Sequence, residues 1–427
     1  MKKKFFLSTV ALLSLGVLAG CGGSGDTSVT PTPTSEPASE PASLEPIPEE
    51  ALNVGTVKVW CAQEILDLTT NQLAEFKAAH PTWTIDFVIE PKSESSAAGD
   101  MIFDPDAGAD LYFFAQDQLA RLVTARAIAQ IPNAYLPYVA RDNAQGSMDA
   151  AKVGSTYYAY PATADNTFFM FYNKADLAGV NLNSFNDIVA KVTDLGKKVY
   201  FNYSSAWYNS AFFYGVGCHS DWTTEDGAFT AYDDNYNSVN GKIAVKAIHE
   251  LFGNAAVAVD DGAGDAFSNN ASVLVSGTWV TATVKDALGA NYGVATLPDF
   301  TVDGVTYPMK TFGGFKLVGV KPQTIIDRTK GISQLAMYLT GEDCSLDRFD
   351  EKGWGPANLP AQNAPRVAED ETLRVCFAQM ATATPQGQYP GDWWDHEGLI
   401  GKEAVKSSYN AETILANYEA GLDDLLS

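Results

Sequence analysis

The chain has 427 residues, of which 46% are hydrophobic and 19% are charged, and this is enough apolar material for two domain cores. Its formal net charge is −24 at pH 7. Nucleic acids and anionic lipid surfaces are bound through cationic patches, so this acidity argues against both as partners.

The first residues are typical of an export signal. Three lysines precede an apolar run over residues 5–17, which is too short for a comfortable membrane span. The run leads through Leu-Ala-Gly to Cys21 and resembles the lipobox of bacterial lipoproteins. We therefore expect residues 1–20 to be removed and Cys21 to be lipidated, so that acyl chains anchor the protein to the outer face of the bacterial cell membrane. An ordinary signal peptide with a chance cysteine is the alternative.

A tether is expected to follow the signal. Residues 21–52 consist largely of Pro, Ser, Thr, Glu and Gly without apolar periodicity. Such a composition buries too little surface to offset the entropy of ordering, so we expect this segment to be disordered.

The first half of the remaining chain alternates strands and helices. Apolar patterns predict strands at residues 56–62, 83–90 and 109–115, and helices from residue 66 to Pro81 and over 117–129. This order predicts an α/β fold with a mostly parallel sheet.

The later segments repeat this style. Further strands are predicted at residues 197–203, 271–279, 291–300 and 312–321, and further helices at 241–253, 330–343, 370–381 and 410–427. Strand-like segments are spread over the whole length, which favours two α/β lobes that the chain crosses several times.

Four cysteines follow Cys21, without the spacing of a zinc ribbon or a redox motif. Because export permits disulfides, Cys344 and Cys376 are a candidate pair. Four unpaired, buried cysteines are the alternative.

The sequence lacks the common catalytic motifs. It has no GxSxG, no phosphate-binding GxxxxGK[ST] and no HExxH, and its four histidines are scattered. We therefore expect no enzyme activity, no cofactor and no metal. Carboxylates that hydrolyse glycosides need only meet in space, so a secreted glycosidase or lyase stays an alternative.

Aromatic residues stand beside polar ones at several predicted strand ends, as in "NYSSAWYNS", "SGTWVT" and "PGDWWDHEG". Ligands of open α/β sheets lie at strand ends, and aromatic faces suit sugar rings. Core packing is the competing explanation, and we prefer it for Trp83 and Phe87.

Three segments together carry a family resemblance. "YPATADNTFFMFYNKADL" (residues 160–177), "FSNNASVLVSGTW" (267–279) and "YGVATLPDF" (292–300) resemble the interlobe crossover, the buried strand and the returning segment of maltodextrin-binding-type proteins. These are extracellular solute-binding proteins of carbohydrate ABC transporters. The resemblance covers most of the chain from about residue 56.

The resemblance implies a two-lobe periplasmic-binding-protein fold of type II. It places residues 53–163 and about 298–341 in the N-terminal lobe, and about 164–297 and 342–427 in the C-terminal lobe. The ligand contacts that it implies are Gln63, Glu64, Phe114, Asp117, Gln118, Asp165 or Asn166, Trp207 or Tyr208, Trp279, and Trp393 or Trp394. Glu64 and Gln118 stand where well-studied maltodextrin binders have basic residues.

The expected function is to capture a carbohydrate, preferably a malto-oligosaccharide, and to deliver it to an ABC permease as a lipid-anchored monomer. One alternative is a receptor for a cationic solute such as a polyamine, which Glu64, Asp117 and Asp165 could bind. We expect no anionic ligand, because no arginine stands in the proposed contact segments. For residues 160–177, a plain interdomain linker is the alternative.

Overall fold

The computed structural model describes residues 44–225, 227–253, 256–259 and 264–426. The predicted signal peptide, Cys21 and most of the predicted tether lie outside these residues. Pro46–Ser427 forms one compact unit. Among the described residues we find no helix with the length and apolarity of a membrane-spanning segment.

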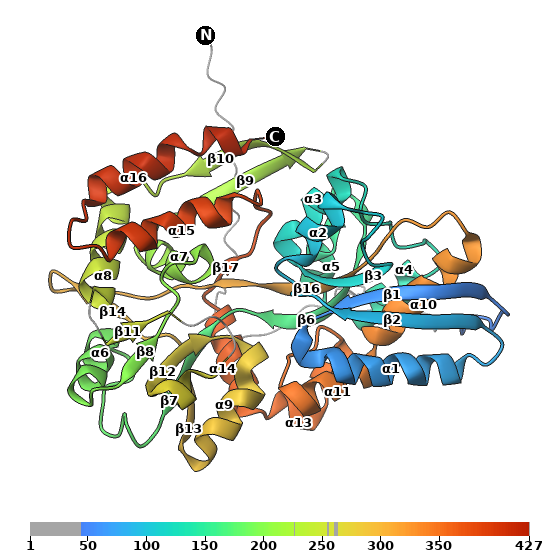
Figure 1. Cartoon of the computed structure of the whole chain (residues 1–427), viewed down its shortest axis with the longest axis horizontal. Helices are drawn as coiled ribbons and strands as arrows, with labels where there is room; N and C mark the ends of the chain where they lie inside the picture. The colour runs from blue at the N-terminus through green and yellow to red at the C-terminus, as the bar shows by residue number, and fades with distance from the viewer. Residues whose placement is uncertain (1–43, 226, 254–255, 260–263, 427) are drawn as a thin grey trace, which may run out of the picture. The chain divides into compact units, whose positions relative to one another are not determined.

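The first sheet gathers strands from distant parts of the chain (Figure 1). Its order is β17 (Thr384–Pro385), β16 (Phe312–Val320), β3 (Leu111–Ala115), β1 (Asn53–Cys61) and β2 (Thr84–Pro91), and β6 (Ala159–Asn166) also pairs with β16. β1 is parallel to β2 and β3, whereas β16 is antiparallel to β3 and β6. The sheet is therefore mixed where the later strand joins it.

The second sheet is also mixed. Its order is β11 (Val257–Ala258), β8 (Lys198–Tyr200), β12 (Ala271–Ser276), β7 (Phe169–Asn173) and β13 (Tyr292–Ala295). β8 is parallel to β11 and β12, while β7 is antiparallel to β12 and β13. Three two-stranded pairs complete the described strands: β4 (Lys152–Val153) with β5 (Thr156–Tyr157), β9 (Ser220–Glu225) with β10 (Ala228–Asp234), and β14 (Phe300–Val302) with β15 (Val305–Tyr307).

Helices lie between these strands in the order that the sequence predicts for an α/β fold. In the first half they are α1 (Leu66–Ala79), α2 (Ala97–Phe103), α3 (Leu119–Thr124), α4 (Leu136–Asp142), α5 (Gln145–Ala150), α6 (Phe185–Asp194), α7 (Ala206–Gly215) and α8 (Val239–Phe252). In the second half they are α9 (Thr281–Leu288), α10 (Ile326–Leu339), α11 (Glu342–Lys352), α12 (Leu359–Gln362), α13 (Pro365–Ala368), α14 (Glu371–Met380), α15 (Trp393–Ala404) and α16 (Ala411–Ala420). Side-chain caps fix some starts, as where Asp370 accepts a hydrogen bond from the amide of Leu373 at 2.9 Å.

The helix predicted over residues 117–129 ends earlier than expected. It is a short 3-10 turn, Gln116–Gln118, followed by α3, which stops at Thr124. Arg126 adopts a positive φ of 55°, and the amide of Ala127 donates back to the carbonyl of Leu122. This left-handed turn closes the helix, and the sequence carries no glycine there to signal it.

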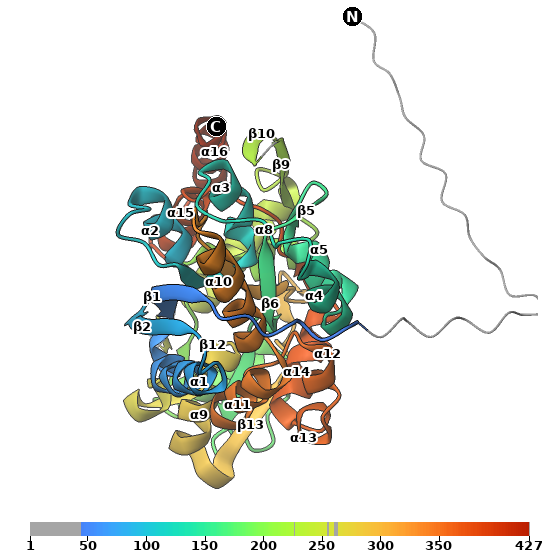
Figure 2. The same ribbon diagram turned by 90° about the vertical axis from the view of Figure 1, so that its right-hand side faces the viewer.

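Both faces of the first sheet are buried. Leu111 and Phe113 of β3 pack in a core with α1 and α10, whereas Tyr112 and Phe114 pack in another with α2 and α3. Successive strand residues point to opposite faces, so a continuous apolar run is what a sheet covered on both sides requires. Figure 2 shows α10 lying across β1.

The chain passes from the first sheet to the second between β6 and β7, within the segment predicted as a crossover. β6 ends at Asn166 and β7 begins at Phe169. Between them Thr167 contacts Thr311, with 2.8 Å between the hydroxyl oxygens, and donates to the carbonyl of Phe312 at 2.6 Å. Two of the connections between the sheets are thus held together by hydrogen bonds.

The lobe boundaries stay a prediction. Phe300 and Val302 pack with the second sheet's core, while Cys344 and Trp354 pack with the first. These contacts favour later crossings than those predicted near residues 298 and 341.

The suggested disulfide between Cys344 and Cys376 is wrong, because the two cysteines are buried in different apolar clusters. Cys61 and Cys218 are also buried and free. The alternative of four unpaired cysteines is therefore the one that the structure has.

Candidate ligand-binding site

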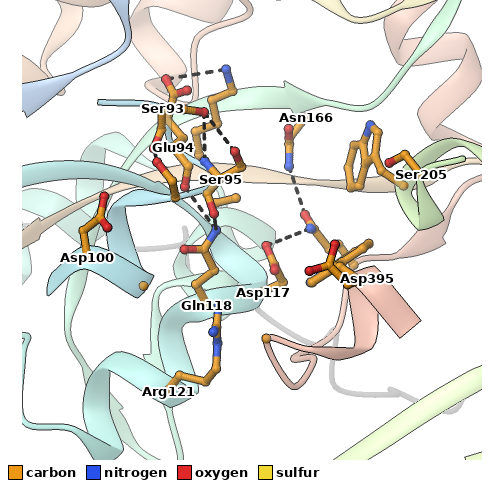
Figure 3. A pocket seen from close by; sticks show the side chains of 18 of the residues that line it. Ser93, Glu94, Ser95, Asp100, Asp117, Gln118, Arg121, Asn166, Ser205 and Asp395 are labelled. Carbon is orange, nitrogen blue, oxygen red and sulfur yellow. Dashed lines mark hydrogen bonds and ion pairs between the residues drawn. The ribbon is translucent and has the colours of Figure 1, made fainter. Parts of the chain in front are cut away.

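A cavity of about 950 Å³ lies at the carboxyl ends of β1, β2 and β3 (Figure 3). Its other side is lined by residues at the start of α7, after β12 and at the start of α15. Ligands of open α/β sheets lie at such strand ends. The lining consists of Glu64, Ser93, Glu94, Ser95, Ser96, Gly99, Asp100, Ala115, Asp117, Gln118, Arg121, Asn166, Ser205, Trp207, Tyr208, Trp279, Lys316, Gln386, Gly391, Asp392, Trp394 and Asp395.

A chain of hydrogen bonds joins three polar side chains of this lining. Gln386 donates from Nε2 to Oδ1 of Asp117 at 2.9 Å, and its Oε1 accepts from Nδ2 of Asn166 at 3.0 Å (Figure 3). The backbone carbonyl of Gln386 in turn accepts from the side chain of Gln116. Asp117 and Asn166 are therefore held in fixed orientations by a residue from late in the chain.

Lys316 is a charged residue inside the apolar strand β16, with 7% of its surface exposed. Its Nζ lies 3.6 Å from Oε1 of Glu94, and 4.1 Å and 5.3 Å from the ring centroids of Trp354 and Trp279. A buried ammonium group needs a carboxylate or an aromatic face to offset its desolvation. The ammonium of Lys316 has both, at the edge of the cavity.

Four aromatic side chains of the lining are half-buried. Trp207 stacks on the buried ring of Phe312, with centroids 5.3 Å apart and planes 12° from parallel. Trp394 also packs on Phe312, at 5.5 Å. The remaining two are Tyr208 and Trp279. Each ring is supported by packing while part of it stays exposed, so the cavity offers several fixed apolar faces.

Trp279 depends on the glycine two positions before it. Gly277 lies so close to the indole ring that a Cβ on this residue would clash with Cζ3 and Cη2. We expect Gly277→Ala to displace Trp279 and to weaken ligand binding by roughly tenfold or more, about 1.4 kcal/mol. Isothermal titration calorimetry checks this. Gly289→Ala is the control for affinity, because no atom lies within 4 Å of the added carbon, although its positive φ costs some stability. Equal affinities of Gly277→Ala and the unmodified protein would contradict the prediction.

Burial raises the pKa of Asp117 to about 7, although Arg121 and a hydrogen bond from Trp394 partly offset the desolvation. The folded protein therefore binds more protons than the unfolded chain between roughly pH 4 and 7, and this group's contribution to stability falls as the pH rises through that range. We therefore expect the free energy of unfolding of Asp117→Asn, relative to that of the unmodified protein, to rise by up to a few kcal/mol from about pH 5 to about pH 8. Urea denaturation of both proteins at the two pH values measures this change. The same relative stability at both pH values would contradict the prediction.

Eight of the predicted site residues line the cavity: Glu64, Asp117, Gln118, Asn166, Trp207, Tyr208, Trp279 and Trp394. For two pairs of adjacent residues the sequence left open which member contacts the ligand. The structure brings Asn166 rather than Asp165, and Trp394 rather than Trp393, to the cavity. Trp207 and Tyr208 both reach it.

Four predicted residues do not line the cavity. Gln63 is exposed outside the lining, and Phe114 faces the core shared with α2 and α3. Asp165 is buried, where it accepts hydrogen bonds from the hydroxyl of Thr278 at 2.5 Å and the amide of Gly355 at 2.6 Å. Trp393 is buried in the second sheet's core. We no longer propose these four as ligand contacts.

Several lining residues were not predicted from the sequence. Residues 93–96 follow β2 just as Glu64 follows β1 and Asp117 follows β3, so their place after a strand is the signal that could have found them. Lys316 could have been found as a lone charge in an apolar strand. Arg121, one turn after Asp117, also lines the cavity, although it stands outside the proposed contact segments. The absence of arginine from those segments is therefore not an argument against an anionic ligand.

Comparison with known proteins identifies the class. Residues 71–375 match the family model of bacterial extracellular solute-binding proteins, and the chain belongs to this family. Its members are substrate-binding proteins rather than enzymes. The two-lobe, type II periplasmic-binding-protein fold is shared with the solved relatives.

Individual proteins of known ligand or structure share about a quarter of their residues with this chain. The chain is 25% identical to a maltotriose-binding protein of Pyrococcus abyssi, over 86% of this chain and 81% of that one. It is 23% identical to a galactooligosaccharide-binding protein of Bacillus subtilis, over 78% and 80%. A protein solved with acarbose is 27% identical and superposes with a TM-score of 0.76, covering 86% of this chain and 98% of that chain.

Proposed function

We propose that this protein captures an oligosaccharide, preferably a malto-oligosaccharide, in the cavity between its two sheets and delivers it to an ABC permease. The observation that carries this proposal is the combination of half-buried aromatic rings with carboxylates, amides and hydroxyls in one cavity of about 950 Å³. Sugars have apolar C–H faces that stack on aromatic rings and hydroxyls that hydrogen-bond to polar groups. The names of the relatives from Pyrococcus abyssi and Bacillus subtilis support the same ligand class.

Capture requires no chemistry. A ligand that binds the closed form better than the open form shifts the population toward closure, and closure is the state that a permease would recognise. In this proposal Cys21 carries the lipid, and residues 22–45 let the two lobes reach the permease from the membrane surface. The predicted tether ends earlier than residue 52, because Ile47 and Leu52 pack on the first sheet's core.

A ligand panel tests the proposal. The panel contains maltose, maltotriose, longer malto-oligosaccharides, galacto-oligosaccharides and spermidine, each measured by thermal shift. A ligand present at about a hundred times its dissociation constant should stabilise the fold by about 2.7 kcal/mol. We expect stabilisation by one saccharide series. A response to spermidine alone would instead support the cationic-solute alternative, which the many carboxylates of the lining make the main competitor.

A further inference from the structure

The side-chain amide of Gln118, at one end of the cavity, has both of its hydrogens occupied by the protein. Gln118 donates from Nε2 to the carbonyls of Glu94 and Ser95, both at 3.1 Å, so both of its amide hydrogens are used. Its Oε1 has no hydrogen-bond partner among the described residues, although the side chain is only 3% exposed. A buried acceptor without a donor costs free energy unless a water molecule or a ligand group satisfies it.

Gln386 fixes the orientation of two more groups. Nε2 of Gln386 donates to the carboxylate of Asp117, so Oε1 of Gln386 is the atom that faces Asn166. Because this oxygen can only accept, Asn166 turns Nδ2 toward it as the donor. Oδ1 of Asn166 is thereby left on the opposite side of its amide. An ionised Asp117 has no hydrogen to donate at either oxygen.

The ionisable groups of the lining also favour hydrogen-bond acceptors over donors. Six acids of the lining, Glu64, Glu94, Asp100, Asp117, Asp392 and Asp395, stand against two cations of the lining, Arg121 and Lys316. Asp100 is also paired with Lys92, with 2.7 Å between Nζ and Oδ2. Lys316 is already within 3.6 Å of Glu94. A ligand carboxylate would be repelled by the remaining acids, whereas a hydroxyl or an ammonium group would satisfy the acceptors.

We propose that Gln386 is a positioning residue that orients Asn166 and Asp117 as acceptors, so that the cavity selects a neutral or amino-substituted saccharide and rejects one that carries a carboxylate. This inference rests on the proposed function and narrows its ligand class. The selectivity comes from the orientation of amides as well as from charge, because an amide turned the other way would present donors to a carboxylate.

Three matched probes test the ligand class on the full chain as purified from cells. They are maltotriose, maltotriose with one terminal ring oxidised to a uronic acid, and maltotriose with one terminal hydroxyl replaced by an amine. Titration calorimetry is done at about pH 8, above the Asp117 pKa of about 7. We expect the uronic acid to bind at least about tenfold more weakly than maltotriose and the amine to bind at least as tightly. Equal binding of the uronic acid and maltotriose would overturn the inference while leaving the proposed function intact. If none of the three saccharides binds, the malto-oligosaccharide preference of the proposed function is overturned, and this inference with it.

Two variants of one segment test the positioning role. Gln386→Leu frees Asn166 to turn its amide, and the preference for maltotriose over the uronic acid should fall several-fold. Gln388→Leu is the control, because Gln388 bonds to the amide of Ala120 and the carbonyl of Gln116 but does not line the cavity. It should keep the preference of the unmodified protein. The same loss of preference in both variants, or in neither, would overturn the role of Gln386. If Gln386→Leu does not fold, Gln386→Met or Gln386→Glu replaces it, and the Glu variant should reject the uronic acid more strongly.

Discussion

Trp394→Ala is expected to weaken the binding of maltotriose about a hundredfold and to leave the fold intact. Trp394 is half-buried at the cavity, where it packs on Phe312 and Tyr389. A tryptophan in this position has the character of a binding hot spot, whose truncation costs about 2–3 kcal/mol. Because part of the ring is exposed, the loss of packing within the protein is smaller than the loss of contact with the ligand.

Calorimetry and denaturation together check this prediction. Trp222→Ala is the matched control, since Trp222 is also half-buried and packs on aromatic neighbours but lies outside the lining. It should keep its affinity for maltotriose. Similar affinities in Trp394→Ala and Trp222→Ala would show that Trp394 does not contact the sugar.

Trp393→Ala is expected to reduce the stability of the protein rather than its affinity for the sugar. In the absence of any ligand, the free energy of unfolding should fall by about 3–5 kcal/mol. Trp393 has none of its surface exposed and donates from Nε1 to the hydroxyl of Tyr418 at 3.1 Å. Its ring packs on Tyr389 with centroids 4.3 Å apart. Removing it leaves a cavity in the second sheet's core and takes one donor from the hydroxyl of Tyr418, which still donates to Asp234 at 2.7 Å.

Urea denaturation of the unliganded protein measures that loss. Trp393→Phe is the control, because a phenyl ring keeps most of the volume and lacks the N–H group and two ring carbons of the indole, and it should cost about 1–2 kcal/mol. A Trp393→Ala variant as stable as the unmodified protein would mean that this side chain is not part of the core. The doublet thus separates a stability role from a binding role at adjacent positions.

The sequence predicted the strand ends well because apolar runs with short polar successors mark them directly. Glu64 follows β1 and Asp117 follows β3, and both reach the cavity. The crossover between β6 and β7 was also recognisable, since its aromatic run enters a buried strand of the second sheet. These features depend on local patterns that survive in a single sequence.

The sequence alone could not show which of two adjacent residues faces the cavity. Asp165 and Asn166 occupy neighbouring positions of a strand, where side chains alternate between faces, and a shift of one residue exchanges them. Trp393 and Trp394 start α15 and point about 100° apart, so only tertiary packing decides which one faces the cavity. Gln386 is remote in the chain from Asp117 and Asn166, and no local pattern connects the three.

A crystal structure of the protein with maltotriose tests the central claim most directly. The account predicts sugar rings in the cavity, with at least one against Trp394 or Trp279 and hydroxyls donating to Asp117 and Asn166. A maltotriose bound elsewhere, or a cavity that excludes maltotriose at saturating concentration and binds spermidine instead, would contradict the carbohydrate assignment and leave only the family and the fold.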